Sequence, residues 1–412
     1  MRWLVTVTVV SLCLPSGAYA QSQDWLVVPT RSDEDTSWME TTVDALAREL
    51  RTQGIGVWRS GAALAGFEKR GSAPPAPVSD ADVDQWSNTA VQALRKLATG
   101  DESTALAELE EAQAFSRENL ESLNRDPERA QAVLDTCLYL VRARIANGDE
   151  RGAAMQADEC VRSVPASEPD TKMHPPPVLA LYELARKAPT GVLRVESEPS
   201  RCPLRLNGAL AGQTPIELEG LARGSYRVQI ECEPDRSARV HRVDVSSGAT
   251  TSLFIFDEFD RAVRSEPVLH LAYDEPPSTA RTAADARQFG RALPAPVVLL
   301  ASRRGEDELE LRVVSTTQVD TTLARIPMTA EGPLPSAVPQ AVGALLAGRC
   351  VGFEADARVR IDCTTGEPLS TADAQAVTTR PARSPVRPPR GQYISGVTLA
   401  STGTASLLAA YG

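Results

Sequence analysis

Residues 204–228 read LRLNGALAGQTPIELEGLARGSYRV. Apolar and polar residues alternate in short runs, which is typical of half-buried strands. Asn207-Gly208 is a strong tight-turn dipeptide, Gly212 can adopt a positive φ, and Pro215 fixes the start of the next run. The punctuation therefore predicts turns between strands rather than a catalytic loop.

The same alternation continues on both sides of this stretch. It is seen in the runs GVLRVESEP, CPLRLNG, PIELEG, SYRVQIEC and ARVHRVDV. About five short strands separated by Gly or Pro are typical of a small β-sandwich. We therefore predict a β-sandwich over residues 190–257.

These residues resemble the PEGA domain family. The resemblance covers residues 191–256, and its motif positions are Pro199, Asn207, Gly208, Gly212, Thr214, Pro215, Gly224 and Tyr226. It implies an exported β-sandwich module with no known catalytic constellation. The family's Pro-Glu-Gly-Ala tetrad is Pro199-Ser200-Arg201-Cys202 here, so the glycine's backbone freedom is lost.

The first 20 residues have the pattern of a signal peptide. Arg2 precedes a short apolar run, and Ala18-Tyr19-Ala20 provides the small residues of a cleavage site. We expect Gln21 to begin the mature, exported protein, in the periplasm or cell envelope; a retained membrane anchor is the alternative.

Six cysteines remain after that cleavage, an even number that favours disulfides in an exported protein. They permit 15 pairings, and we expect neighbours to pair because the six fall two by two into separate segments. The candidates are Cys137 with Cys160, Cys202 with Cys232, and Cys350 with Cys363. For the first pair, two buried thiols are the alternative. No spacing typical of a zinc site occurs, so no metal or cofactor is expected.

Residues 79–188 are predicted to be helical. The segment TGDESTALAELEEA (99–112) aligns with NGDERGAAMQADEC (147–160), and in both copies Gly-Asp-Glu ends one helix and begins the next. This resembles tetratricopeptide-like helical hairpins. Ser79, with Asp82 three residues later, is expected to cap the first helix.

Two further segments alternate strand and helix patterns. A small α/β unit is predicted over residues 24–70, with strands at 25–29 and 55–58, and a second α/β unit over 266–364. Both resemble modules of envelope proteins. The first unit resembles the amino-terminal modules of several such proteins, including the Tol-system translocation protein. The fold class is therefore multi-domain α+β.

The end of the chain has a different composition. Residues 366–391 are a Pro/Arg-rich linker, expected to be extended. Residues 392–412 are uncharged and rich in small residues, so they are a candidate membrane or packing helix. A mobile tail is the alternative. An end at Gly412 is also compatible with a sequence that is truncated there.

Catalytic signatures are absent from the sequence. There is no Walker loop, HExxH, GxSxG or SxxK motif. His241 and His270 are expected to be structural, and His174 a solvated loop residue. The acidic runs DEFD (257–260) and GEDELE (305–310) are expected to be solvated turns, with calcium binding as the alternative.

A net charge of −11 argues against a general nucleic-acid binder, since no basic excess is present to neutralise phosphates. We expect a non-enzymatic, exported cell-envelope protein that acts as a protein-interaction scaffold. The alternative is a periplasmic glycan- or ligand-binding module, with Tyr226 and the neighbouring turns as its contact surface. A hydrolase is a third hypothesis. Envelope proteins are the expected partners, with glycan or peptidoglycan and a C-terminal membrane contact as further candidates.

Overall fold

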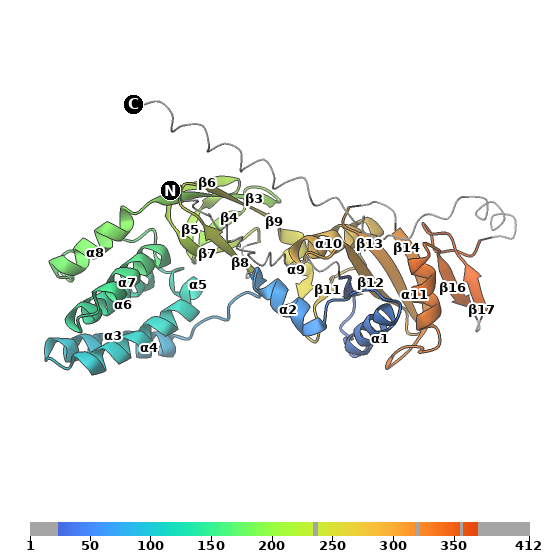
Figure 1. Ribbon diagram of the computed structural model, residues 1–412, viewed down its shortest axis with the longest axis horizontal. Helices are drawn as coiled ribbons and strands as arrows, with labels where there is room; N and C mark the ends of the chain where they lie inside the picture. Colours follow the sequence, from blue (N-terminus) through green and yellow to red (C-terminus); the bar gives the residue numbers. More distant parts are fainter. Residues whose placement is uncertain (1–23, 234–237, 318–320, 355–356, 370–412) are drawn as a thin grey trace, which may run out of the picture.

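The structure is a computed structural model that describes residues 24–233, 238–317, 321–354 and 357–369. It is elongated, with a helical lobe at one end, a β-sandwich in the middle and an α/β lobe at the other end (Figure 1). The multi-domain α+β class is confirmed. The expected signal peptide, nearly all of the Pro/Arg-rich linker and the 392–412 segment lie outside the described residues.

The helical lobe consists of packed hairpins. Its helices are α3 (Asp80–Ala98), α4 (Glu102–Glu118), α5 (Leu120–Leu123), α6 (Pro127–Ala146), α7 (Glu150–Ser163) and α8 (Pro176–Arg186). Ser79 caps α3 by accepting a hydrogen bond from the Asp82 amide at 3.2 Å. Gly100 and Gly148 end α3 and α6 with positive φ, so the two repeat copies form equivalent hairpin turns.

The loop before α8 departs from expectation. His174 is buried, its Nε2 lies 3.0 Å from Asp135 Oδ1, and its ring lies 5.4 Å from that of Tyr139. The prediction of a solvated His174 is therefore wrong. The cause is that α8 packs back against α7 and α6, which covers the loop.

The middle of the molecule is a two-sheet sandwich. Its strands are β2 (Gly71–Ser72), β3 (Thr190–Glu198), β4 (Pro203–Leu206), β5 (Ala209–Gln213), β6 (Ile216–Ala222), β7 (Gly224–Ile230), β8 (Val240–Val245) and β9 (Thr250–Phe256). One sheet has the order β2-β8-β7-β4-β5, and the other β6-β3-β9. The alternation that predicts the strands buries Leu193, Leu204, Val228 and Val245 in the core between the sheets.

The α/β lobe is built on one large sheet with the order β10-β11-β1-β12-β13-β14-β16-β17, and β15 pairs with β14. Its strands are β1 (Leu26–Arg31), β10 (Val263–Arg264), β11 (His270–Ala272), β12 (Val297–Arg304), β13 (Glu308–Ser315), β14 (Thr321–Thr329), β15 (Gly332–Pro333), β16 (Val351–Glu354) and β17 (Ala357–Arg360). Its helices are α1 (Met39–Thr52), α2 (Ser60–Glu68), α9 (Asp257–Ala262), α10 (Thr279–Ala292) and α11 (Val338–Leu346).

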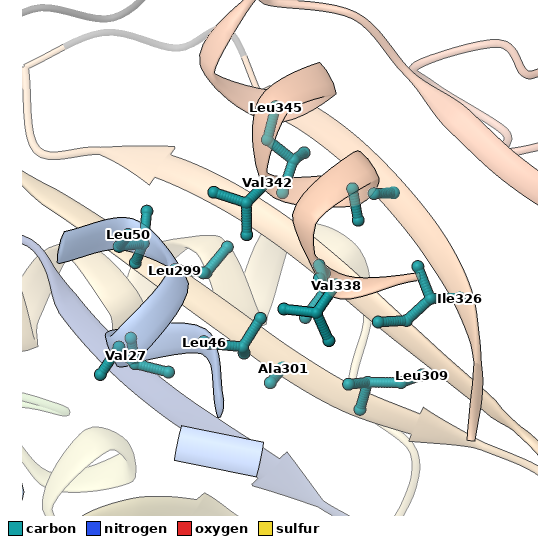
Figure 2. Packing of buried hydrophobic residues seen from close by; sticks show 14 of the residues in the cluster. Val27, Leu46, Leu50, Leu299, Ala301, Leu309, Ile326, Val338, Val342 and Leu345 are labelled. Carbon is teal, nitrogen blue, oxygen red and sulfur yellow. The ribbon is translucent and has the colours of Figure 1, made fainter. Parts of the chain in front are cut away.

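Helices cover both faces of this sheet. Leu46 and Leu50 of α1 and Val338, Val342 and Leu345 of α11 pack on one face (Figure 2). Phe67 of α2, Phe259 of α9 and Phe289 of α10 form an aromatic cluster on the other face. The result is a three-layer α/β/α lobe.

The two α/β segments that were expected as separate units share this sheet. β1 pairs in parallel with both β11 and β12, so its neighbours are more than 230 residues away in sequence. A short apolar strand needs a partner on each side, and local pattern does not identify distant partners. The helical lobe and the sandwich are thus an insertion within one α/β lobe.

Two smaller expectations for the α/β lobe are also corrected. The second strand predicted over 55–58 is only an isolated bridge between Val57 and Trp25. The DEFD run is not a solvated turn: it belongs to α9, where Asp257 is buried and Asp260 faces His241.

Candidate functional site

The Thr-Pro step of the sandwich fixes the loop that precedes β4. The Thr214 amide donates to the Cys202 carbonyl at 3.0 Å, and Thr214 Oγ1 accepts from the Cys202 amide at 3.2 Å. The Arg201 amide donates to the Thr214 carbonyl at 2.7 Å. These bonds hold residues 199–202 against β5, so Thr214 has a structural role.

Two motif positions in this region require a left-handed backbone. Arg201 has φ +68° and Asn207 has φ +51°. Asparagine tolerates this conformation, whereas arginine is strained in it. Arg201 therefore adopts a backbone conformation that suits glycine and that strains a residue with a Cβ.

Tyr226 is part of the sandwich core and not of a contact surface. It is 1% exposed, and its hydroxyl donates to the Ala222 carbonyl at 2.8 Å. Burial raises its pKa to about 12. The expectation that Tyr226 contacts a glycan is therefore wrong, because its ring is covered by the two sheets.

The cysteines lie in three pairs at bonding distance, as neighbour pairing predicts. Cys137 and Cys160 join α6 to α7 with a Cα–Cα separation of 5.7 Å. Cys202 and Cys232 join the residue before β4 to the segment after β7, with a Cα–Cα separation of 4.5 Å. Cys350 and Cys363 join the segment after α11 to the segment after β17.

The β-sandwich in the middle of the molecule matches a known family. Residues 190–255 match the PEGA domain family. The chain carries a PEGA domain. No curated protein and no solved structure matched the chain. The PEGA domain and the three disulfides together indicate an extracellular or periplasmic protein.

The tight turn of the PEGA domain binds the helical lobe. Asn207 Nδ2 donates to the Arg162 carbonyl at 2.7 Å, and Asn124 Nδ2 donates to the Asn207 carbonyl at 2.8 Å. A Cβ at Gly208 would lie 2.4 Å from the Glu121 carbonyl oxygen. The Asn-Gly dipeptide therefore makes a close interdomain contact in addition to a turn.

Charged groups extend this contact between the PEGA domain and the helical lobe, which we call the first junction. Arg227 donates to Glu121 Oε2 at 2.6 Å and to the Arg117 carbonyl at 2.7 Å. Glu231 binds Arg205 of its own domain and Arg125 of the helical lobe. Burial alone would raise the pKa of Glu231, but the hydrogen bonds from the two arginines outweigh burial and lower it.

A second junction joins the PEGA domain to the α/β lobe. β2, which follows α2, pairs with β8 of the PEGA sheet. Arg239 is 6% exposed, donates to the Gly71 and Val263 carbonyls at 3.0 and 3.1 Å, and lies 5.2 Å from the centre of the Phe67 ring. Its guanidinium thus binds both segments that connect the α/β lobe to the PEGA domain, the one after α2 and the one after α9. Burial lowers the pKa of this group.

His241 adds a polar pair to the second junction. Its Nε2 lies 2.6 Å from Asp260 Oδ2 of α9. His270, in contrast, is buried in the α/β lobe, where its Nδ1 lies 2.8 Å from the Val268 carbonyl and burial lowers its pKa. Sequence reasoning missed Arg239 and Asp260, since strand parity places Arg239 outside the sandwich core without indicating what covers it.

A cavity of about 550 Å³ lies at the second junction. Its walls come from the end of α2, the segment after β2, the end of β7, the residues before β8 and the region of α9 and β10, and they carry both signs of charge. The charged and hydroxyl side chains that line it are those of Glu68, Glu231, Glu233, Arg239, Asp257, Asp260, Arg261, Arg264, Ser265 and Glu266.

Two features are absent from the described part of the chain. Within 24–369, apart from the three short gaps, no group of His, Cys, Asp and Glu has the arrangement to hold a metal ion. The helices in the same part of the chain include none that is both long and apolar enough to cross a membrane.

Proposed function

We propose that this chain is a non-enzymatic, exported cell-envelope protein that acts as a protein-interaction scaffold. The observation that carries the proposal is the position of the PEGA domain, which is bound to one lobe through Asn207 and to the other through Arg239. Both contacts are buried and directional, so they favour a fixed spacing between the lobes. Fixed spacing is what a scaffold that presents two surfaces needs.

The helical lobe provides a surface suited to partners. Three of its large apolar side chains are well exposed: Met155 at 58%, Met173 at 49% and Leu184 at 68%. Leu184 lies on α8, the last helix of the lobe, Met173 in the loop before α8 and Met155 on α7. Exposed apolar side chains of this size are candidates for protein contacts. Because each of the three histidines is held by a neighbour in the fold, the structure also favours a structural role for them over catalysis.

The proposal is tested in cross-linked envelopes of the native host. A tagged full-length chain should fractionate with the envelope and co-purify a reproducible set of envelope proteins. Leu184→Glu should lower their recovery at least fivefold, whereas Leu210→Glu, at a leucine of similar exposure on the PEGA domain, should not. Recovery of the chain from cytosol alone, or equal recovery of partners with both variants, would contradict the proposal.

A ligand-binding role is the second candidate, and the cavity at the second junction favours it. Its volume of about 550 Å³ lies within the range of small-molecule sites, which often occur between domains. Charged walls of both signs suit a polar ligand such as a peptidoglycan fragment. Soluble muropeptides and a glycan panel should then raise the Tm of the full chain, and Ser265→Tyr should abolish the rise. No change in Tm with any of these compounds removes this candidate.

A further inference from the structure

An exposed phenylalanine, Phe254, lies beside a half-buried one, Phe256, on the edge strand β9 of the PEGA domain. β9 is the last strand of its sheet, and within the described residues its outer side has no strand partner. Phe254 is 49% exposed, and its ring centre lies 4.6 Å from that of Phe256. Phe256 also packs against the apolar cluster of the α/β lobe, which anchors the pair. Isolated exposed leucines are common, but an exposed phenylalanine in contact with a second, tilted ring is a candidate contact surface.

The aromatic pair lies beside carboxylates. In the β3–β9 register, Glu196 is opposite Phe254 and Glu198 is opposite Phe256. Glu196 binds Arg194 at 2.7 Å, and Glu198 is exposed on the same side of the strand. Glu217 and Glu219 of β6 are exposed further along this sheet. We call Phe254, Phe256, Glu196 and Glu198 the Phe254 strip. Four carboxylates against one guanidinium give the region a negative charge.

The chain itself contains a segment with complementary chemistry. Residues 380–390 read RPARSPVRPPR, with four arginines and no acidic residue. In a polyproline helix, which has three residues per turn, Pro385 and Pro388 would fall on one side and Arg387 and Arg390 on another. Proline faces of this kind bind aromatic surfaces, and arginine binds carboxylates and aromatic rings.

We propose that the Phe254 strip binds the segment 380–390 of this chain. The prolines would contact the two rings, and the arginines would pair with Glu196 and Glu198. The binding would bring the Pro/Arg-rich linker onto the PEGA domain and thereby fix where the following residues, 392–412, leave the protein. This inference does not depend on the scaffold proposal, because it concerns a contact within the chain.

Photo-cross-linking of the full-length protein tests the proposal. p-Benzoylphenylalanine placed at Phe254 should form a cross-link to a tryptic peptide from the 380–390 region, and the same probe at Leu210 should not. A product of monomer size shows binding within one molecule and supports the proposal, whereas a product of dimer size alone shows binding between copies and overturns it. Cross-links at Phe254 that lead only to other segments, or no cross-link at all, overturn it.

A binding measurement provides the second arm. The acceptor is the full chain with Arg383, Arg387 and Arg390 changed to Ala, and the probe is a synthetic peptide of residues 378–391. Phe254→Ser in this acceptor should weaken binding at least tenfold, as should a peptide with its four arginines changed to Glu. Leu210→Ser should leave binding unchanged. Raising the salt concentration should weaken binding, because the pairing is ionic at the surface. Equal affinity with Phe254→Ser, once circular dichroism shows both variants folded, overturns the proposal.

Discussion

Asn207 of the PEGA domain donates a hydrogen bond to the Arg162 carbonyl of α7 at 2.7 Å and accepts one from the Arg227 amide at 2.8 Å. A single side chain thus closes a turn of the sandwich and joins it to the helical lobe. Since Asn207 is 2% exposed, both bonds are made without competing water. The residue that predicts a turn from sequence is also the centre of the first junction.

Asn207→Ala should therefore destabilise the protein more than loss of an ordinary turn residue. It leaves the Arg162 carbonyl and the Arg227 amide without the Asn207 side chain as a partner, and it places at φ +51° a residue that tolerates the left-handed backbone less well than asparagine. We expect a loss of about 3 kcal/mol in the free energy of unfolding, measured by urea denaturation. Asn207→Asp keeps the acceptor for the Arg227 amide and tolerates the backbone, but it turns a carboxylate oxygen towards the Arg162 carbonyl and should lose about as much as Ala. A clearly smaller loss with Asp would contradict the role of the amide donor.

Arg201→Gly should stabilise the PEGA domain. Arg201 is exposed and has φ +68°, a conformation that costs a residue with a Cβ about 1–2 kcal/mol. Glycine adopts it freely but loses more entropy on folding, so a net gain of about 1 kcal/mol is expected in thermal unfolding. Arg201→Ala removes the same charge but keeps the Cβ. A gain with Ala as large as that with Gly would show that charge, and not backbone strain, is responsible.

The Cys202–Cys232 disulfide should account for a large share of the PEGA domain's stability. It closes a loop with a sequence separation of 30, and the loop-entropy account predicts about 3–4 kcal/mol. The double change to Ala should lower the free energy of unfolding by that amount. Mass spectrometry of the exported chain under non-reducing conditions should find Cys202 and Cys232 in one linked peptide pair. Free thiols at both positions would exclude this bond.

The Glu231 contacts should make the first junction sensitive to acid. The folded-state pKa of Glu231 is lowered from the ordinary value of 4.5, so its stabilisation is present above that pH and is lost as the pH falls through the lowered pKa. Glu231→Gln should cost about 1–2 kcal/mol at pH 7, because both arginine pairings are half-buried or better. The difference between wild type and Glu231→Gln should shrink as the pH falls below about 4. A difference that is constant from pH 7 to pH 3 would contradict the assignment.

The sandwich could be predicted from sequence because its signals are local. Asn207-Gly208 and Thr214-Pro215 mark turns by their own chemistry, and strand parity places Cys202 and Cys232 on the core side. β9 was missed as a strand because TTSLFIF precedes a helix with no turn residue between them. The candidate glycan contact failed for a related reason: the alternation that makes Tyr226 a strand residue also buries it.

The joined α/β lobe and the two junctions could not be predicted in this way. β1 finds its partners after an insertion of two other domains, and no local pattern records that pairing. His174 and Arg239 are polar residues in loop and strand patterns typical of exposed positions. Their burial results from elements far along the chain, α6 in one case and the α2–β2 and α9–β10 segments in the other.

By our proposal, the PEGA domain holds the helical and α/β lobes at a fixed separation. The most direct test of this separation is single-molecule energy transfer between dyes on cysteines introduced at Met155 of α7 and Glu40 of α1, both exposed. We expect one narrow efficiency distribution for the wild-type background and a broad one when Asn207→Ala and Arg239→Ala are combined. A broad distribution without those two changes would contradict the claim.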